Sequence, residues 1–170
     1  GKSVLEYVRG KDFGNVNEGQ EKARVLEKFE NIFQRDGSES YNQIREEMKE
    51  IMMTHCGVFR DEEKLKVCIE TLKGLQERFK KGKVTDKGKL FNTEIYEIME
   101  LGNMLSMAEI ITFTALYRQE SRGGHFRTDF PKRNDEKFLH HSLVYDSPDG
   151  FVIKTKPVVI TKYQPAERTY

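Results

Sequence analysis

Residues 93–120 are the longest apolar segment of the chain, and they limit its possible folds more than any other feature. A helix over this segment would be about 40 Å long at 1.5 Å per residue. A helix that is apolar on all sides is normally buried on all sides, but the other helices of a small bundle cover only one side. We therefore expect the uncovered side to contact another domain or another copy of the chain. The apolar residues are Ile95, Tyr96, Ile98, Met99, Leu101, Met104, Leu105, Met107, Ile110, Ile111, Phe113 and Leu116.

Shorter helices are predicted before this segment, over residues 1–10, 17–37, 38–57 and onward from 61. Polar residues that accept hydrogen bonds from the first free backbone amides of a helix stand at three of these starts. Apolar side chains then recur at steps of three and four, the spacing that packs helices side by side. The expected N-caps are Asn17, Ser38 and Asp61, and the clearest stripe is Leu65, Cys68, Leu72, Leu75 and Phe79.

The pattern changes after Gly123 and Gly124, where β-branched and alternating residues replace helical spacing. The stretches "FLHHSLVYD" and "GFVIKTKPVVIT" lie on either side of "SPDG", a turn sequence. We expect a hairpin, an extended stretch and the tail "KYQPAERTY". The fold class predicted from the residues is mainly α, a helical bundle with one long helix and a short β-hairpin and extended C-terminal tail.

Composition excludes several classes of protein. A net charge of +1 over 170 residues provides no global field to attract nucleic acid. Two cysteines, Cys56 and Cys68, are too few for a disulfide framework and are expected to be reduced packing residues of a cytosolic protein. No apolar run approaches the roughly 20 residues of a spanning helix, and no signal peptide is visible. The chain starts without Met, which processing, engineering or a cut from a longer polypeptide would explain.

Residues 118–143 carry three histidines among many charges, which raises two chemical readings. A metal site is disfavoured because the adjacent His140 and His141 would point to opposite faces of a strand. A catalytic base at His125 is disfavoured because no nucleophile accompanies it.

The preferred interpretation of the same segment is structural. Its arginines and acids pair with one another and with backbone groups, and hold an irregular segment against a neighbouring surface. The two glycines end the long helix and allow positive φ or close backbone approach. The residues assigned to this docking segment are Arg122, Gly123, Gly124, His125, Arg127, Asp129 and Asp135.

Residues 78–89 have six basic side chains and one Asp. A phosphate or lipid site is possible, but a solvated loop is favoured because no aromatic residue lies between the lysines. The sequence also has no GxGxxG after a strand, no GxxxxGKS loop, no CxxC pair and no GxSxG elbow. We expect a domain that has no active site of its own and that covers a surface of another domain or protein.

A family resemblance adds to this reading. "ESRGGHFRTDFPKRNDEKFLHHSL", residues 120–143, closely resembles the ESRGAHxRxDFPxRDDExxLxHSL segment of succinate dehydrogenase and fumarate reductase flavoprotein subunits. The ending "PAERTY" is similar to their terminal PPxxRxY, and "GKSVLEYVRG" to the helix that closes their FAD-binding domain. The departures are Gly124 for Ala, Asn134 for Asp and Phe138 for Trp.

The resemblance implies a three-helix, spectrin-like bundle of up-down topology. Residues 1–12 would be the end of the FAD-binding domain, residues 13–124 the bundle, and residues 125–170 a tail packed on the bundle and on the absent FAD domain. The whole subunit would bind FAD and interconvert succinate and fumarate, either as a succinate dehydrogenase or as a fumarate reductase, in the tricarboxylic acid cycle or in electron transport.

In that family the catalytic and flavin-binding residues lie upstream of this segment, so no catalytic, cofactor-binding or metal-ligating residue is assigned here, and no FAD is expected in these 170 residues alone. The implied partners are the FAD-binding domain and an iron–sulfur subunit, at the inner face of the cytoplasmic membrane without insertion into it, and no nucleic acid. Two alternatives stay open: the C-terminal domain of an L-aspartate oxidase, and a stand-alone helical interaction module.

Overall fold

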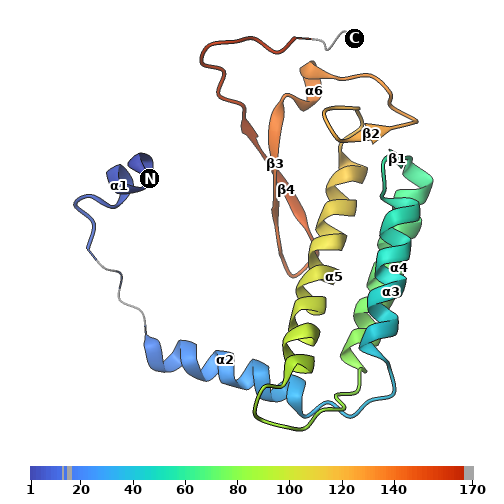
Figure 1. Cartoon of the computed structure of the whole chain (residues 1–170). Coiled ribbons are helices and arrows are strands. Elements are labelled where there is room, and N and C mark those ends of the chain that lie inside the picture. The colour runs from blue at the N-terminus through green and yellow to red at the C-terminus, as the bar shows by residue number, and fades with distance from the viewer. Residues whose placement is uncertain (13, 15–16, 167–170) are drawn as a thin grey trace.

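The computed structural model describes residues 1–12, 14 and 17–166, and three of its helices run side by side as an up-down bundle (Figure 1). Helices α3, α4 and α5 form this bundle, and the C-terminal third of the chain folds over one end and one side of it. The mainly α fold with a short C-terminal hairpin is therefore confirmed. The helices are α1 (Lys2–Val8), α2 (Glu18–Phe33), α3 (Tyr41–His55), α4 (Glu62–Lys80), α5 (Thr93–Tyr117) and α6 (Asp135–Phe138), and the strands are β1 (Phe59–Arg60), β2 (Phe126–Arg127), β3 (His140–Tyr145) and β4 (Val152–Pro157).

The core of the bundle lies between one stripe of each helix. The α4 stripe predicted from sequence is buried at Leu65, Cys68, Leu72 and Leu75. Removing such side chains from water stabilises the fold by about 25 cal/mol per Å² of apolar surface. The buried stripe of α5 consists of Ile95, Ile98, Leu101, Leu105, Ala108, Thr112 and Ala115.

Helix α5 is not covered on all sides by the rest of the chain. Tyr96 is 70% exposed and Met107 is 54% exposed, and Ile111 is also exposed. The hairpin covers another part of the helix, where Phe113 and Phe151 pack with ring centroids 5.7 Å apart. The expectation that the bundle leaves apolar surface of this helix uncovered is therefore confirmed.

Several helix ends differ from the predicted ones, and α2 ends at Phe33 instead of Gly37. Ser40, not Ser38, caps α3 by accepting a hydrogen bond from the Gln43 amide. The chain stays extended before Ser40 because Asp36 and Glu39 bridge to residues 82–83. At the other end of the bundle α5 stops at Tyr117 instead of Glu120, because the Glu120 carboxylate turns inward as described below.

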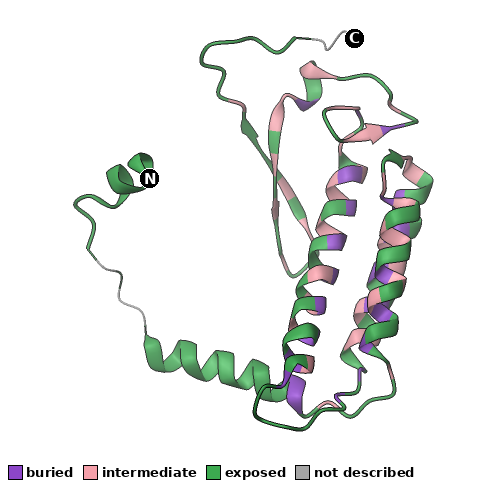
Figure 2. Ribbon diagram, viewed as in Figure 1, coloured by how far each residue is buried: buried purple, intermediate pink, exposed green. Residues whose placement is uncertain are grey.

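Helices α1 and α2 have few contacts with the bundle. The N-cap of α2 is Asn17, as predicted, but only Ile32 and Phe33 of this helix are buried. Its other apolar side chains, Val25, Leu26 and Phe29, are exposed. Figure 2 shows α2 as an exposed rod that projects from the base of the bundle. Within residues 13–124, the structure therefore places most of α2 outside the packed core.

The hairpin forms at the predicted turn. Strands β3 and β4 pair antiparallel from His140–Pro157 to Tyr145–Val152. Gly150 adopts φ +105, a value that L side chains rarely adopt, and its amide donates to the Ser147 carbonyl. None of the described helices is both long and apolar enough to cross a membrane.

Candidate functional site

Arg127 is the anchor of the segment that follows α5. Its side chain is fully buried, and Nη1 donates to the carbonyls of Ala115 at 3.0 Å and Leu116 at 3.2 Å. The last carbonyls of a helix have no partner within the helix and carry partial negative charge. The guanidinium supplies these carbonyls with hydrogen-bond donors and with a positive charge. Its Nε and Nη2 donate to the two carboxylate oxygens of Asp129 at 2.7 and 2.6 Å.

Asp129 connects this anchor to the start of α4. Its Oδ2 also accepts a hydrogen bond from the Glu62 amide at 3.0 Å. The hydrogen bond from Arg127 and the amide of Glu62 lower the pKa of Asp129, although burial opposes the shift. Beside it, β1 and β2 pair in parallel, and the Thr128 amide donates to the Arg60 carbonyl at 2.8 Å. The segment therefore fastens the C-terminal end of α5 to the N-terminal end of α4.

Glu120 is a second buried centre, and it is not among the residues predicted for the docking segment. Its carboxylate is fully buried and accepts hydrogen bonds from Arg118, from Arg122 Nε at 2.9 Å and from the Asn134 amide at 2.8 Å. Burial alone would raise the pKa of Glu120, but these three donors outweigh it and lower the pKa. Arg122 also pairs with Asp135, which a second arginine, Arg133, contacts at 2.9 Å.

His125 has both ring nitrogens in hydrogen bonds. Nε2 lies 3.0 Å from the Arg118 carbonyl, and Nδ1 lies 3.0 Å from Arg60 Nη1. A carbonyl only accepts and a guanidinium only donates, so the ring is neutral with its proton on Nε2. Burial, followed by the nearby arginines Arg60, Arg127 and Arg118, lowers the pKa of His125. A general base needs a free nitrogen beside its substrate, so the geometry does not favour catalysis at His125.

The glycines shape the turn between these groups. Arg122 and His125 exchange two backbone hydrogen bonds of 2.7 and 2.9 Å around Gly123 and Gly124. Gly123 has φ +58, which favours glycine.

All charged residues assigned to the docking segment from sequence lie in this region, and each has a partner inside the chain. Their role in docking stays a prediction.

The histidines of the metal-site hypothesis, His125, His140 and His141, line one hollow. His140 and His141 alternate between the two faces of β3, with His141 the more exposed. No group of three His, Cys, Asp or Glu side chains in the described part of the chain is arranged to hold a metal ion. Cys56 and Cys68 are both buried and unbonded to each other.

Residues 78–80 of the predicted basic loop belong to α4, and residues 81–89 form the loop at the opposite end of the bundle. Arg78 pairs with Glu39 at 2.9 Å and with Glu47, and Lys87 Nζ donates to the Phe33 carbonyl at 2.8 Å. Arg78 and Lys87 therefore bind groups of the chain itself and are not free to bind a phosphate or a lipid. The same contacts show that the segment is held against the bundle and is not simply a solvated loop.

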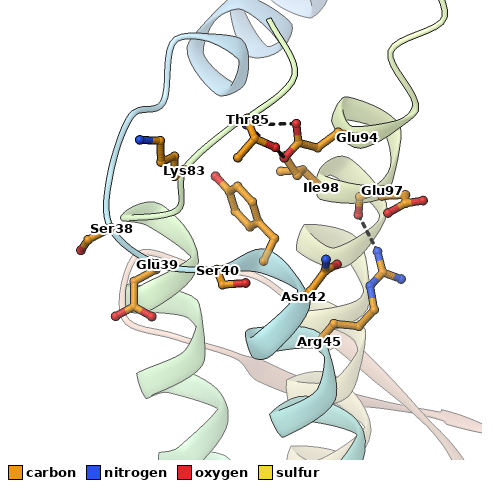
Figure 3. A pocket seen from close by; sticks show the side chains of 11 residues that line it. Ser38, Glu39, Ser40, Asn42, Arg45, Lys83, Thr85, Glu94, Glu97 and Ile98 are labelled. Carbon is orange, nitrogen blue, oxygen red and sulfur yellow. Dashed lines mark hydrogen bonds between the residues drawn. The ribbon is translucent and has the colours of Figure 1, made fainter.

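The hollow beside this loop, shown in Figure 3, has a volume of about 280 Å³. Glu94 accepts hydrogen bonds there from the amide and hydroxyl of Thr85 at 3.0 and 2.8 Å. Arg45 donates to the Glu97 carbonyl at 2.9 Å. The charged groups that face the hollow therefore hold the loop and the start of α5, and they do not form a catalytic arrangement.

Comparison with known proteins places the chain in a family. Residues 45–170 match the family described as fumarate reductase flavoprotein C-term. The chain is 35% identical to the fumarate reductase flavoprotein subunit of Haemophilus influenzae, over all of this chain and 29% of that protein. It is 33% identical to the succinate dehydrogenase flavoprotein subunit of Rickettsia bellii, over 86% of this chain and 26% of that protein.

Solved structures agree with this match. A quinol–fumarate reductase solved with menaquinol molecules superposes with a TM-score of 0.86 at 34% identity, over 97% of this chain and 29% of that one. The adenylylsulfate reductase of Archaeoglobus fulgidus, at 19% identity and a TM-score of 0.74, shares the fold alone. The chain thus spans less than a third of the length of the proteins it matches, and it belongs to the family of fumarate reductase flavoprotein C-terminal domains.

Proposed function

We propose that these 170 residues are the helical C-terminal domain of an FAD-dependent flavoprotein subunit that interconverts succinate and fumarate. The domain would dock on the rest of the subunit and support its assembly, and the chemistry would take place outside it. The subunit would pass electrons to an iron–sulfur subunit and lie at the inner face of the cytoplasmic membrane without spanning it. Names of relatives that cover the chain support the proposal, since they are fumarate reductase and succinate dehydrogenase flavoprotein subunits.

The observation that carries the docking role is the apolar stripe of α2. Val25, Leu26 and Phe29 follow the helical spacing of a buried face, yet all three are exposed in this chain. An apolar helix face is stable when it is packed against another element. The α1 side chains Val4, Leu5 and Val8 are also exposed, and they add apolar surface that another part of the protein would cover. More than two thirds of the length of the relatives is available to supply a covering surface.

The described residues do not fit FAD. Dinucleotides bind where a glycine-rich turn joins a strand of a parallel sheet to a helix, and the two sheets here are a two-residue parallel pair and a hairpin. The arginines of the site are occupied by carboxylates and carbonyls within the chain. No step of flavin chemistry is therefore assigned to these residues.

A comparison of two purified proteins tests the proposal. The full-length protein that contains these residues should be yellow, show a bound-flavin spectrum and oxidise succinate or reduce fumarate with artificial electron carriers. The 170-residue chain should show neither property. Flavin-dependent turnover by the 170-residue chain, or a flavin-free and inactive full-length protein after reconstitution with FAD, would contradict the proposal.

A further inference from the structure

One hollow beside the C-terminal end of α5 has a lining with basic side chains and no acidic one. Its volume is about 400 Å³, and it lies between the start of β3, the β1 strand and the last turns of α5. Neither Asp nor Glu is among the lining residues. Besides three residues of α5, the lining comprises Arg60, Arg118, His125, His140, His141 and Ser142.

Arg60 differs from the other arginines of this region. Arg118, Arg122, Arg127 and Arg133 each pair with a carboxylate, whereas no carboxylate of the described chain lies within 4 Å of Arg60. Its Nε donates to the carbonyls of Cys56 at 3.1 Å and Gly57 at 2.8 Å, and Nη1 donates to His125. These bonds fix the guanidinium in place and leave Nη2 without an acceptor among the described residues. A partly buried cation without a counter-charge is unfavourable.

Two further polar groups at the hollow are not fully used. The Nε2 atom of His140 is buried and has no hydrogen-bond partner in the described part of the chain. Native proteins leave few buried polar atoms unpaired. Ser142 Oγ accepts a hydrogen bond from Arg118 at 3.2 Å, which leaves its own hydroxyl proton available. The Arg60 guanidinium and the Ser142 hydroxyl therefore each keep a donor for an anion that enters the hollow.

We propose that this hollow receives the carboxylate of an acidic side chain from the part of the flavoprotein outside these 170 residues. The inference rests on the proposed function, because it names what the docking surface would bind. A planar guanidinium held by two carbonyls presents its remaining N–H groups to a carboxylate without further loss of side-chain freedom. Charge complementarity favours Asp or Glu, and the longer relatives provide the chain length that would carry it.

Histidine titration distinguishes a carboxylate from simple covering of the hollow. Burial by an apolar or neutral surface lowers the pKa of a histidine, whereas a carboxylate within about 4–6 Å raises it by about 1 unit or more. The pKa values of His125 and His140 are already lowered in this chain, first by burial. The charged groups that act on the two rings are Arg60, Arg118, Arg122, Arg127, Glu120 and His141.

The experiment compares the full-length flavoprotein with the 170-residue chain, each carrying histidine labelled at Cε1 with carbon-13, by NMR as a function of pH. We expect the pKa values of His125 and His140 to be higher in the full-length protein by about 1 unit. Arg60→Gln in both proteins should remove most of that difference, Arg60→Lys should keep part of it, and the exposed control Arg24→Gln should keep all of it. Equal or lower pKa values in the full-length protein would overturn the proposal.

A second arm identifies the source of the carboxylate. Sodium acetate, compared with sodium chloride at equal ionic strength, should shift the two histidine resonances of the 170-residue chain saturably, and Arg60→Gln should weaken that binding at least tenfold. Acetate binding without any difference in the full-length protein would mean a site for a free carboxylate, and the proposal would be wrong. The flavin spectrum and turnover of the same full-length sample test the proposed function separately, so the two failures are distinguishable.

Discussion

Helices α2 and α4 have the same type of sequence pattern, but the apolar stripe of α4 is buried and that of α2 is exposed. They have 16 and 19 residues, begin at the polar N-caps Asn17 and Asp61, and carry apolar side chains at helical spacing. In α4 the stripe is closed: Leu72 has no exposed surface. In α2 Leu26 remains 57% exposed. The same pattern therefore describes a face that the chain itself covers and a face that the chain leaves exposed.

The largest effect on stability is expected from Arg127, the buried anchor that joins α5 to α4. Arg127→Ala should lower the free energy of unfolding by about 3–5 kcal/mol, because it leaves Asp129 without its cation and two terminal carbonyls of α5 without donors. Urea unfolding measures the change. Arg24→Ala, which removes an exposed pair with Glu21, should cost no more than about 1 kcal/mol. Equal losses for the two variants would show that Arg127 is not buried.

A matched leucine pair tests the comparison directly. Leu72→Ala should cost about 2–5 kcal/mol because it opens a cavity in the core. Leu26→Ala, the same chemical change in α2, should stay within about 0.5 kcal/mol. A cost of 2 kcal/mol or more for Leu26→Ala would show that α2 packs on the bundle in solution.

Glu120 supplies a pH-dependent effect within the closed region. The pKa of its carboxyl is lowered in the folded chain, so its contribution to stability is complete above the unfolded value of about 4.3 and is lost as pH falls through the folded value. Glu120→Gln should lower the free energy of unfolding at pH 7 by about 1.5–3 kcal/mol and flatten its fall below about pH 4.3. An unchanged acid profile in the variant would show that Glu120 is not the responsible carboxylate.

The smallest effect is expected on the outer face of α4. Gly74 lies within this helix with nothing within 4 Å of the place where a Cβ would stand. Gly74→Ala should therefore raise the free energy of unfolding by about 0.5–1 kcal/mol, because alanine loses less backbone freedom in a helix. A loss of stability would indicate a close neighbour that the described residues do not include.

Local sequence signals were enough to predict the presence of the helices, the buried stripe of α4 and the turn of the hairpin. Spacing and N-caps such as Asn17 and Asp61 act over a few residues, and "SPDG" sets its own turn. The exposure of α2 was not predictable from its residues, because an apolar stripe carries no information about where its partner lies. The role of Glu120 was missed because it depends on contacts with the Asn134 amide and two arginines that fold around it. Alternating charges beside Gly123 and Gly124 were the only available signal.

The measurement that tests the central claim most directly is hydrogen–deuterium exchange of the α2 amides, residues 18–31, in the 170-residue chain and in the full-length protein. If α2 lacks its covering surface in these 170 residues, its amides should exchange fast in the 170-residue chain. Exchange should be slowed at least about 100-fold in the full-length protein, since covering a helix face adds several kcal/mol of protection. Equal exchange rates in the two proteins would contradict the account.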